Sequence, residues 1–136
     1  MEITKGFLKK TILVYFVLLI LYFVIEYYLY NYYLDDVLFK GYYHYFISEN
    51  IFLIFSLITL EIYLISLLLI YFFKPIGKQL NLYSFILLNF IIFLMGDTVS
   101  ISAVYPIDDF LSFLEIFILY IIYFTPLKKE FNKNNS

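Results

Sequence analysis

The chain has 136 residues, and 64% of them are hydrophobic. Since a soluble domain carries about 45–50% apolar residues, this composition is too apolar for a chain that must cover its own surface in water. The net charge of -2 and the absence of cysteine exclude a nucleic-acid-binding face, disulfides and cysteine-ligated metals.

The first apolar segment predicts a membrane-spanning helix over residues 11–30. About 20 apolar residues are needed to cross the hydrocarbon. Lys5, Lys9 and Lys10 precede the segment, and tyrosines follow it, as is typical of the membrane interface. Because bulky residues rather than a small-residue cleavage site follow, we expect the segment to be retained and not removed as a signal peptide.

The middle of the chain predicts two further spanning helices. Residues 31–50 are too apolar for a free loop and too short and charged to span, so we expect an outside loop lying in the interface. The second helix is predicted over 51–73, where Pro75 and Gly77 would stop it. The third is predicted over 80–104.

A tight outside turn around Pro106 precedes a fourth predicted helix over residues 110–125. Residues 128–136 form a polar tail, which we expect to be flexible and cytoplasmic. Short connections make neighbouring helices antiparallel. The whole chain, 1–136, is therefore predicted to be one membrane domain: an all-α, integral membrane, up-down-up-down four-helix bundle.

The lysines predict how this bundle is oriented. Lysine-rich loops stay in the cytoplasm during insertion. Placing every cluster on one side requires two crossings between neighbouring clusters, which puts both termini in the cytoplasm. The expected location is the cell membrane, cytoplasmic or inner in a bacterium, as a multi-pass protein. Apart from Lys40, the lysines form three clusters, namely Lys5, Lys9 and Lys10; Lys74 and Lys78; and Lys128, Lys129 and Lys133.

Each predicted helix contains an acidic residue, namely Glu26, Glu61, Asp97 and Glu115. At about 1.5 Å per residue, all four lie in the outer half, and Glu61 is near the midplane. A buried carboxylate costs roughly 2.5–3.5 kcal/mol in the membrane and usually faces the bundle interior. Together with Asn89, the four form a candidate ion or proton site. Alternatively, Glu26 is solvated among the tyrosines, Asp97 and Glu115 reach the headgroups, and Glu61 is protonated and hydrogen-bonded.

Two polar stripes accompany these carboxylates. In the third predicted helix, Asn89, Gly96, Ser100 and Ala103 share one face. Small residues on a helix face permit close helix approach, inside the bundle or between copies; lining a polar path is the alternative. The second predicted helix has its own polar stripe, made by Ser56, Thr59, Tyr63 and Ser66. Glu61 lies well away from this stripe.

Catalytic motifs are missing from the sequence. It contains no glycine-rich phosphate loop, nucleophile elbow or zinc-ligand spacing. His44, the single histidine, lies among tyrosines in the predicted outside loop. We therefore expect no catalytic residues, no metal site, no cofactor and no enzymatic activity.

Two functions from different classes remain. The first is non-enzymatic action through contacts with membrane lipids and with another membrane protein or a second copy. In outline the chain resembles the immunity proteins that protect bacteria from pore-forming bacteriocins, which are short, aromatic-rich and polytopic with lysine-rich ends. This resemblance is architectural and rests on no motif, and an accessory subunit of a membrane complex fits equally well. The second is a cation or proton channel, or a transporter subunit, that uses the intramembrane carboxylates.

Overall fold

The computed structural model describes residues 4–33, 49–95 and 105–131. Within these residues the chain is all-α, with four α-helices, one short 3-10 helix and no β-strand, which confirms the predicted fold class at this level. The helices are α1 (Lys5–Tyr33), α2 (Glu49–Tyr71), α3 (Pro75–Met95), α4 (Tyr105–Phe124) and η1 (Pro126–Lys129).

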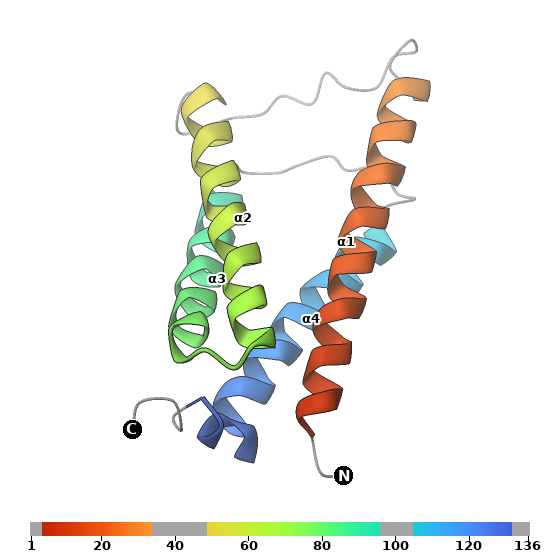
Figure 1. Cartoon of the computed structure of the whole chain (residues 1–136). Coiled ribbons are helices and arrows are strands. Elements are labelled where there is room, and N and C mark those ends of the chain that lie inside the picture. The colour runs from red at the N-terminus through yellow and green to blue at the C-terminus, as the bar shows by residue number, and fades with distance from the viewer. Residues whose placement is uncertain (1–3, 34–48, 96–104, 132–136) are drawn as a thin grey trace.

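The four α-helices pack as two pairs. Figure 1 shows α2 beside α3 and α1 beside α4, and these two pairings are the most extensive ones in the bundle. The start of α1, the α2–α3 turn and η1 all lie at the same end of the molecule, here called the lysine end. α4 slants across the bundle to reach this end, where the Tyr123 hydroxyl donates a hydrogen bond to the carbonyl oxygen of Lys78 at 2.9 Å.

α1 begins before the predicted start of the apolar segment at Thr11. The backbone N–H of Phe7 donates to both the side-chain and the backbone oxygen of Thr4, at 3.2 and 3.1 Å. A threonine that accepts such bonds satisfies donors that the first helical turn leaves unpaired. The helix therefore begins at Lys5 and continues to Tyr33, beyond the predicted end.

At the α2–α3 turn, the residue that ends α2 is not the one that the sequence predicts. Phe73 adopts a left-handed conformation, with φ of 57°. The N–H of Lys74 donates to the carbonyl of Leu69, and the N–H of Phe73 donates to that of Ile70, both at 2.8 Å. These two bonds form a Schellman cap, which glycine usually provides. Pro75 follows as the first residue of α3, where its missing N–H costs no hydrogen bond.

Gly77, expected from the sequence to stop a helix, instead lies inside α3 and faces α2. A Cβ atom at this position would lie 2.6 Å from the Cβ of Leu69 and 2.9 Å from the backbone nitrogen of Ile70. Real side chains do not approach that closely. The glycine therefore lets the two helix backbones come into direct contact.

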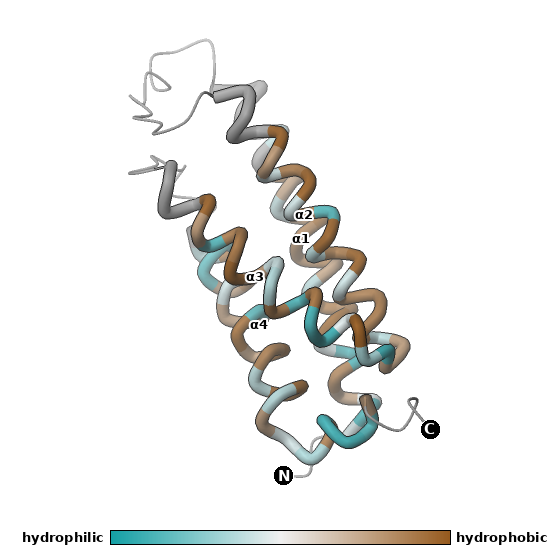
Figure 2. The backbone as a smooth tube through the Cα atoms, turned by 90° about the vertical axis from the view of Figure 1, so that its left-hand side faces the viewer, coloured by the Kyte–Doolittle hydropathy of each residue, from teal (hydrophilic) through white to brown (hydrophobic). Residues whose placement is uncertain are grey.

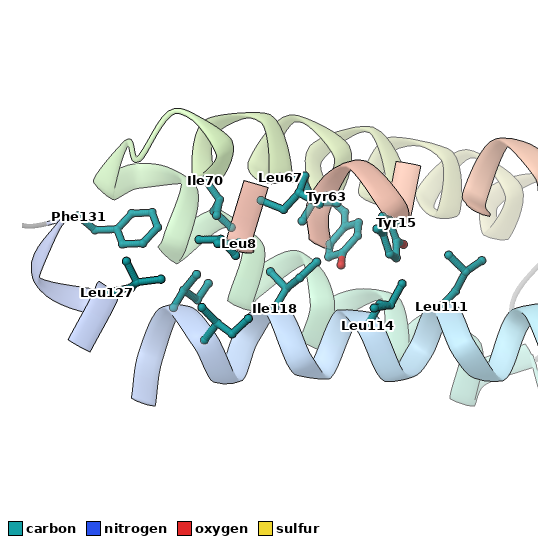
Figure 3. Packing of buried hydrophobic residues seen from close by; sticks show 13 residues of the cluster. Leu8, Tyr15, Tyr63, Leu67, Ile70, Leu111, Leu114, Ile118, Leu127 and Phe131 are labelled. Carbon is teal, nitrogen blue, oxygen red and sulfur yellow. The ribbon is translucent and has the colours of Figure 1, made fainter. Parts of the chain in front are cut away.

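The hydrophobic core lies between α1, α2 and α4 and extends to the lysine end (Figure 3). Its residues recur at helical spacing on each element, which places them on one face. α1, α2 and α4 thus contribute one inward stripe each. The buried members are Leu8, Ile12 and Tyr15 of α1; Tyr63, Leu67 and Ile70 of α2; Leu111, Leu114, Ile118, Ile121 and Ile122 of α4; and Leu127 and Phe131.

The last described residues, 125–131, close the core at the lysine end. α4 ends at Phe124 because Pro126 follows. Thr125 caps η1, its hydroxyl accepting a bond from the N–H of Leu127 at 3.3 Å. Phe131 is fully buried, and its ring centroid lies 5.3 Å from that of Phe73 in the α2–α3 turn.

Away from the lysine end the helices separate. In Figure 1, α1 and α2 diverge toward the opposite end of the molecule. Between Phe16 and Tyr28, none of the described side chains of α1 is buried, and the same holds for α2 between Ile54 and Ile58. Figure 2 shows that these stretches are mainly hydrophobic, so apolar side chains cover the outside of the bundle here.

Within the described residues, two helices are long and apolar enough to cross a membrane. The qualifying stretches are Lys5–Ile25 in α1 and Ile54–Tyr71 in α2. The predicted third span, 80–104, extends into residues 96–104, which lie outside the described part of the chain. Of the predicted outside loop and tail, residues 34–48 and 132–136 also lie outside it.

Candidate functional site

The two candidate carboxylates with described side chains face different surroundings. Glu115 of α4 is half-buried, and one of its carboxylate oxygens accepts a hydrogen bond of 2.6 Å from the hydroxyl of Tyr15 in α1. Glu61 of α2 is exposed. It lies roughly 200° around the helix from the buried Tyr63. The structure therefore does not bring Glu61 and Glu115 together.

Among the described residues, the structure places no other predicted site side chain in the interior of the bundle. Asn89 is exposed, and its amide nitrogen donates to the carbonyl of Phe85 one turn earlier, at 2.8 Å. Glu26 lies within α1, but its side chain is not among those described. The remaining predicted residues lie outside the described part of the chain; they are Asp97 and the packing residues Gly96, Ser100 and Ala103.

Tyr15 and Tyr63 meet in the centre of the bundle, beside Glu115. Their ring centroids are 5.9 Å apart with an interplanar angle of 67°, an edge-to-face contact. Figure 3 shows both rings between the helices and facing α4. Both side chains are buried, and the Tyr63 hydroxyl makes no hydrogen bond to any described residue.

A buried amide continues this polar region into α3. The side-chain nitrogen of Asn81 donates to the hydroxyl of Ser66 at 3.0 Å, and that hydroxyl donates to the carbonyl of Tyr63 at 2.6 Å. Asn81 is completely buried, and its side-chain oxygen has no hydrogen-bond partner among the described residues. A buried polar atom without a partner costs about 1–3 kcal/mol, so this region contains two such costs, at Tyr63 and Asn81.

These residues form one interior polar cluster to which all four α-helices contribute. Its chemical groups are a carboxylate, three hydroxyls and an amide, which supply hard oxygen atoms but no nucleophile paired with a base. Such groups can hold a small polar or cationic species. The members of the interior polar cluster are Tyr15, Tyr63, Ser66, Asn81 and Glu115.

The sequence identifies part of this cluster. Tyr63 and Ser66 belong to the polar stripe of the second predicted helix, and Glu115 is a candidate carboxylate. Tyr15 is one of 16 tyrosines, and nothing in its neighbours distinguishes it. Asn81 lies so close to the start of the third predicted helix that it reads as an interface residue.

At the lysine end, lysines of the first cluster lie over aromatic rings of the α2–α3 turn. The Lys5 nitrogen is 5.4 Å from the ring centroid of Phe73, and the Lys9 nitrogen is 4.7 Å from that of Tyr71. Both distances are within the range of cation–π attraction. Lys5 also pairs with the carboxylate of Glu130. The start of α1 is thus tied to the turn and to the end of the chain.

Lysines of the second and third clusters approach each other at the same end. The Lys78 nitrogen lies 4.3 Å from the ring centroid of Tyr123. The pKa of Lys78 is lowered, first by partial burial and then by the positive charge of Lys128. The lysine end therefore gathers positive charge from all three clusters.

Together these features define an all-α protein of four helices, two of them long and apolar enough to cross a membrane, among the residues described. Comparison with protein families, with curated proteins and with solved structures finds no match for this chain.

Proposed function

We propose that this chain is a multi-pass protein of the cell membrane with four spanning helices, which acts without catalysis through lateral contacts with another membrane protein or a second copy of itself. The observation that carries the proposal is the outward apolar surface of every helix. Val17, Phe55, Phe90 and Phe113, one from each, are 65%, 58%, 56% and 57% exposed. In water such exposure forfeits about 25 cal/mol for each Å² left unburied, whereas lipid tails solvate it without that cost.

The distribution of charge supports an orientation with the lysine end in the cytoplasm. Described lysines of all three clusters lie at the lysine end, where the start of α1 and η1 also lie. Lysine-rich ends are retained on the cytoplasmic side during insertion. The opposite ends of the helices would then face outward.

The outer face of α4 offers a specific surface for lateral contact. Five aromatic residues, here called the aromatic ridge, are spaced alternately by three and four positions, the spacing of helix–helix packing. Stacked pairs have ring centroids 6.2, 5.8 and 5.9 Å apart. Because the rings already hold one another in place, binding a partner helix would cost little side-chain conformational entropy. The ridge comprises Phe110, Phe113, Phe117, Tyr120 and Phe124. Four of these are exposed, whereas Phe117 is half-buried and contacts Phe7 of α1 edge to face.

Single cysteines test the orientation directly, since the chain has none of its own. In intact cells, a membrane-impermeant maleimide should label Asp108→Cys, near the start of α4. Thr4→Cys and Lys128→Cys should react only after the membrane is permeabilised. Labelling Thr4→Cys and Lys128→Cys from opposite sides, or recovering the chain in the soluble fraction, would contradict the proposed orientation.

Photo-crosslinking tests the lateral contact. A benzophenone attached to Phe113→Cys on the aromatic ridge should give a protein adduct of discrete mass in native membranes. The matched control is Ile86→Cys on α3, which is 56% exposed but off the ridge; it should capture lipid alone. If both positions capture only lipid, α4 has no lateral partner. Mass spectrometry of the adduct distinguishes a second copy from another protein.

A further inference from the structure

We propose that the interior polar cluster is a binding site for one monovalent metal cation, held by the Glu115 carboxylate, the Tyr63 hydroxyl oxygen and the Asn81 side-chain oxygen. This site is independent of the lateral contacts on α4, because its residues face the inside of the bundle. It also differs from the carboxylate cluster that the sequence predicts, since Glu61 is on the outside.

The first argument is charge. Glu115 lies between helices, and no lysine pairs with it within the described residues, where the ion pair is between Lys5 and Glu130. The hydrogen bond from Tyr15 stabilises the carboxylate but leaves its charge in place. A carboxylate taken out of water either takes up a proton or is balanced by an opposite charge close by. A single positive charge neutralises a single carboxylate, whereas a divalent ion would leave an excess.

The second argument is the pair of buried oxygens without partners. The side chains of Tyr63 and Asn81 are 1% and 0% exposed, and the oxygen of each has no hydrogen bond to any described residue. Hydroxyl, amide and carboxylate oxygens can replace the hydration shell of a small cation, as carbonyl oxygens do in ion-conducting proteins. Binding an ion would turn two unfavourable buried atoms into ligands. The Tyr63 hydroxyl keeps its proton and offers a lone pair.

The third argument is the position of the cluster along the bundle. Toward the lysine end it is followed by a layer of completely buried apolar side chains, including Leu8, Ile70 and Ile118. On the other side, the described residues of α1 beyond Tyr15 are no longer buried. On α4, however, Leu111 and Leu114 on this same side are still buried, so apolar side chains flank the cluster in both directions. Such a site binds an ion and joins the helices, but does not conduct through a single chain.

Calorimetric titration of the detergent-purified protein tests this site. In a buffer whose only cation is N-methylglucamine, added sodium or potassium chloride should give saturable binding at one site per chain. Glu115→Gln should weaken that binding at least tenfold, and so should Asn81→Leu, which removes the amide oxygen. The matched control is Glu61→Gln, the same exchange on the outer surface, which should bind like the wild type.

Several outcomes would overturn the proposal. They are the absence of saturable sodium or potassium binding in the wild type, equal affinity in Glu115→Gln, and tighter binding of calcium than of either alkali metal ion. Should Glu115→Gln fail to fold, Tyr63→Phe provides the decision, since it removes only the hydroxyl oxygen and keeps the ring contact with Tyr15. Unchanged affinity in a folded Tyr63→Phe protein would rule out the proposed ligand set. Proton uptake without any alkali metal binding would identify Glu115 as an acid and end the proposal.

Discussion

Gly77→Ala is expected to lower the thermal unfolding midpoint of the detergent-solubilised protein by about 3–12 °C. The added methyl carbon would lie 2.6 Å from the Cβ of Leu69 and 2.9 Å from the backbone nitrogen of Ile70. Because one of these atoms belongs to the backbone, no side-chain rotation relieves the clash, and α3 must move away from α2. Overpacking of this kind costs about 1–3 kcal/mol, and a domain of this length loses about 3–4 °C for each kcal/mol.

Gly6→Ala is the matched control for this exchange, since it adds the same methyl group to α1. There the nearest atom to the new carbon is the Thr4 hydroxyl oxygen, at 3.8 Å, an ordinary contact. Alanine is favoured over glycine in a helix by about 0.5–1 kcal/mol, so the midpoint should stay the same or rise slightly. Circular dichroism melting of both variants provides the comparison. Equal midpoints would show that α2 and α3 do not touch at Gly77.

Phe131→Ala is expected to destabilise the protein by about 3–5 kcal/mol, the usual cost of removing a fully buried phenylalanine ring. The ring is 0% exposed and packs against Phe73 at the lysine end. Its loss would leave a cavity beneath the α2–α3 turn and release η1. Melting should therefore occur at lower temperature, and trypsin should cleave faster after Lys128 and Lys129.

Phe124→Ala removes the same ring from a side chain that is 77% exposed on α4. Surface substitutions usually change stability by no more than about 0.5 kcal/mol, so this variant should melt and resist trypsin much like the wild type. The reverse order, with Phe124→Ala the more damaging, would contradict the placement of the chain end.

The helices themselves follow from the sequence because long apolar stretches, separated by lysine, proline and acidic residues, leave few alternatives. The rotation of each helix does not. A soluble helix shows its inner face as an apolar stripe among polar residues, but here apolar residues occupy both faces. Val17 and Ile12 are chemically alike, yet the first is 65% exposed and the second is 1% exposed.

This ambiguity explains why the sequence alone does not show which carboxylate belongs to the interior site. Glu61 and Glu115 both read as intramembrane carboxylates, and only the packing of α1 against α4 shows that Glu115 meets Tyr15. The α2–α3 turn was unpredictable for a different reason. Glycine is the usual left-handed residue at a helix end, so Gly77 is the expected stop. Phe73 takes that conformation instead, while its ring packs on Phe131, and Gly77 serves helix contact.

The pairing of α1 with α4 has a consequence for biosynthesis. α2 and α3 are neighbours in sequence and can associate as soon as their turn has been made, whereas α1 must wait for the last helix before its main contact exists. Contacts between distant parts of a chain form late because a long loop must first be closed. During translation, α2 and α3 therefore pair first, while α1 still lacks its main partner. The bundle closes only once α4 has been made.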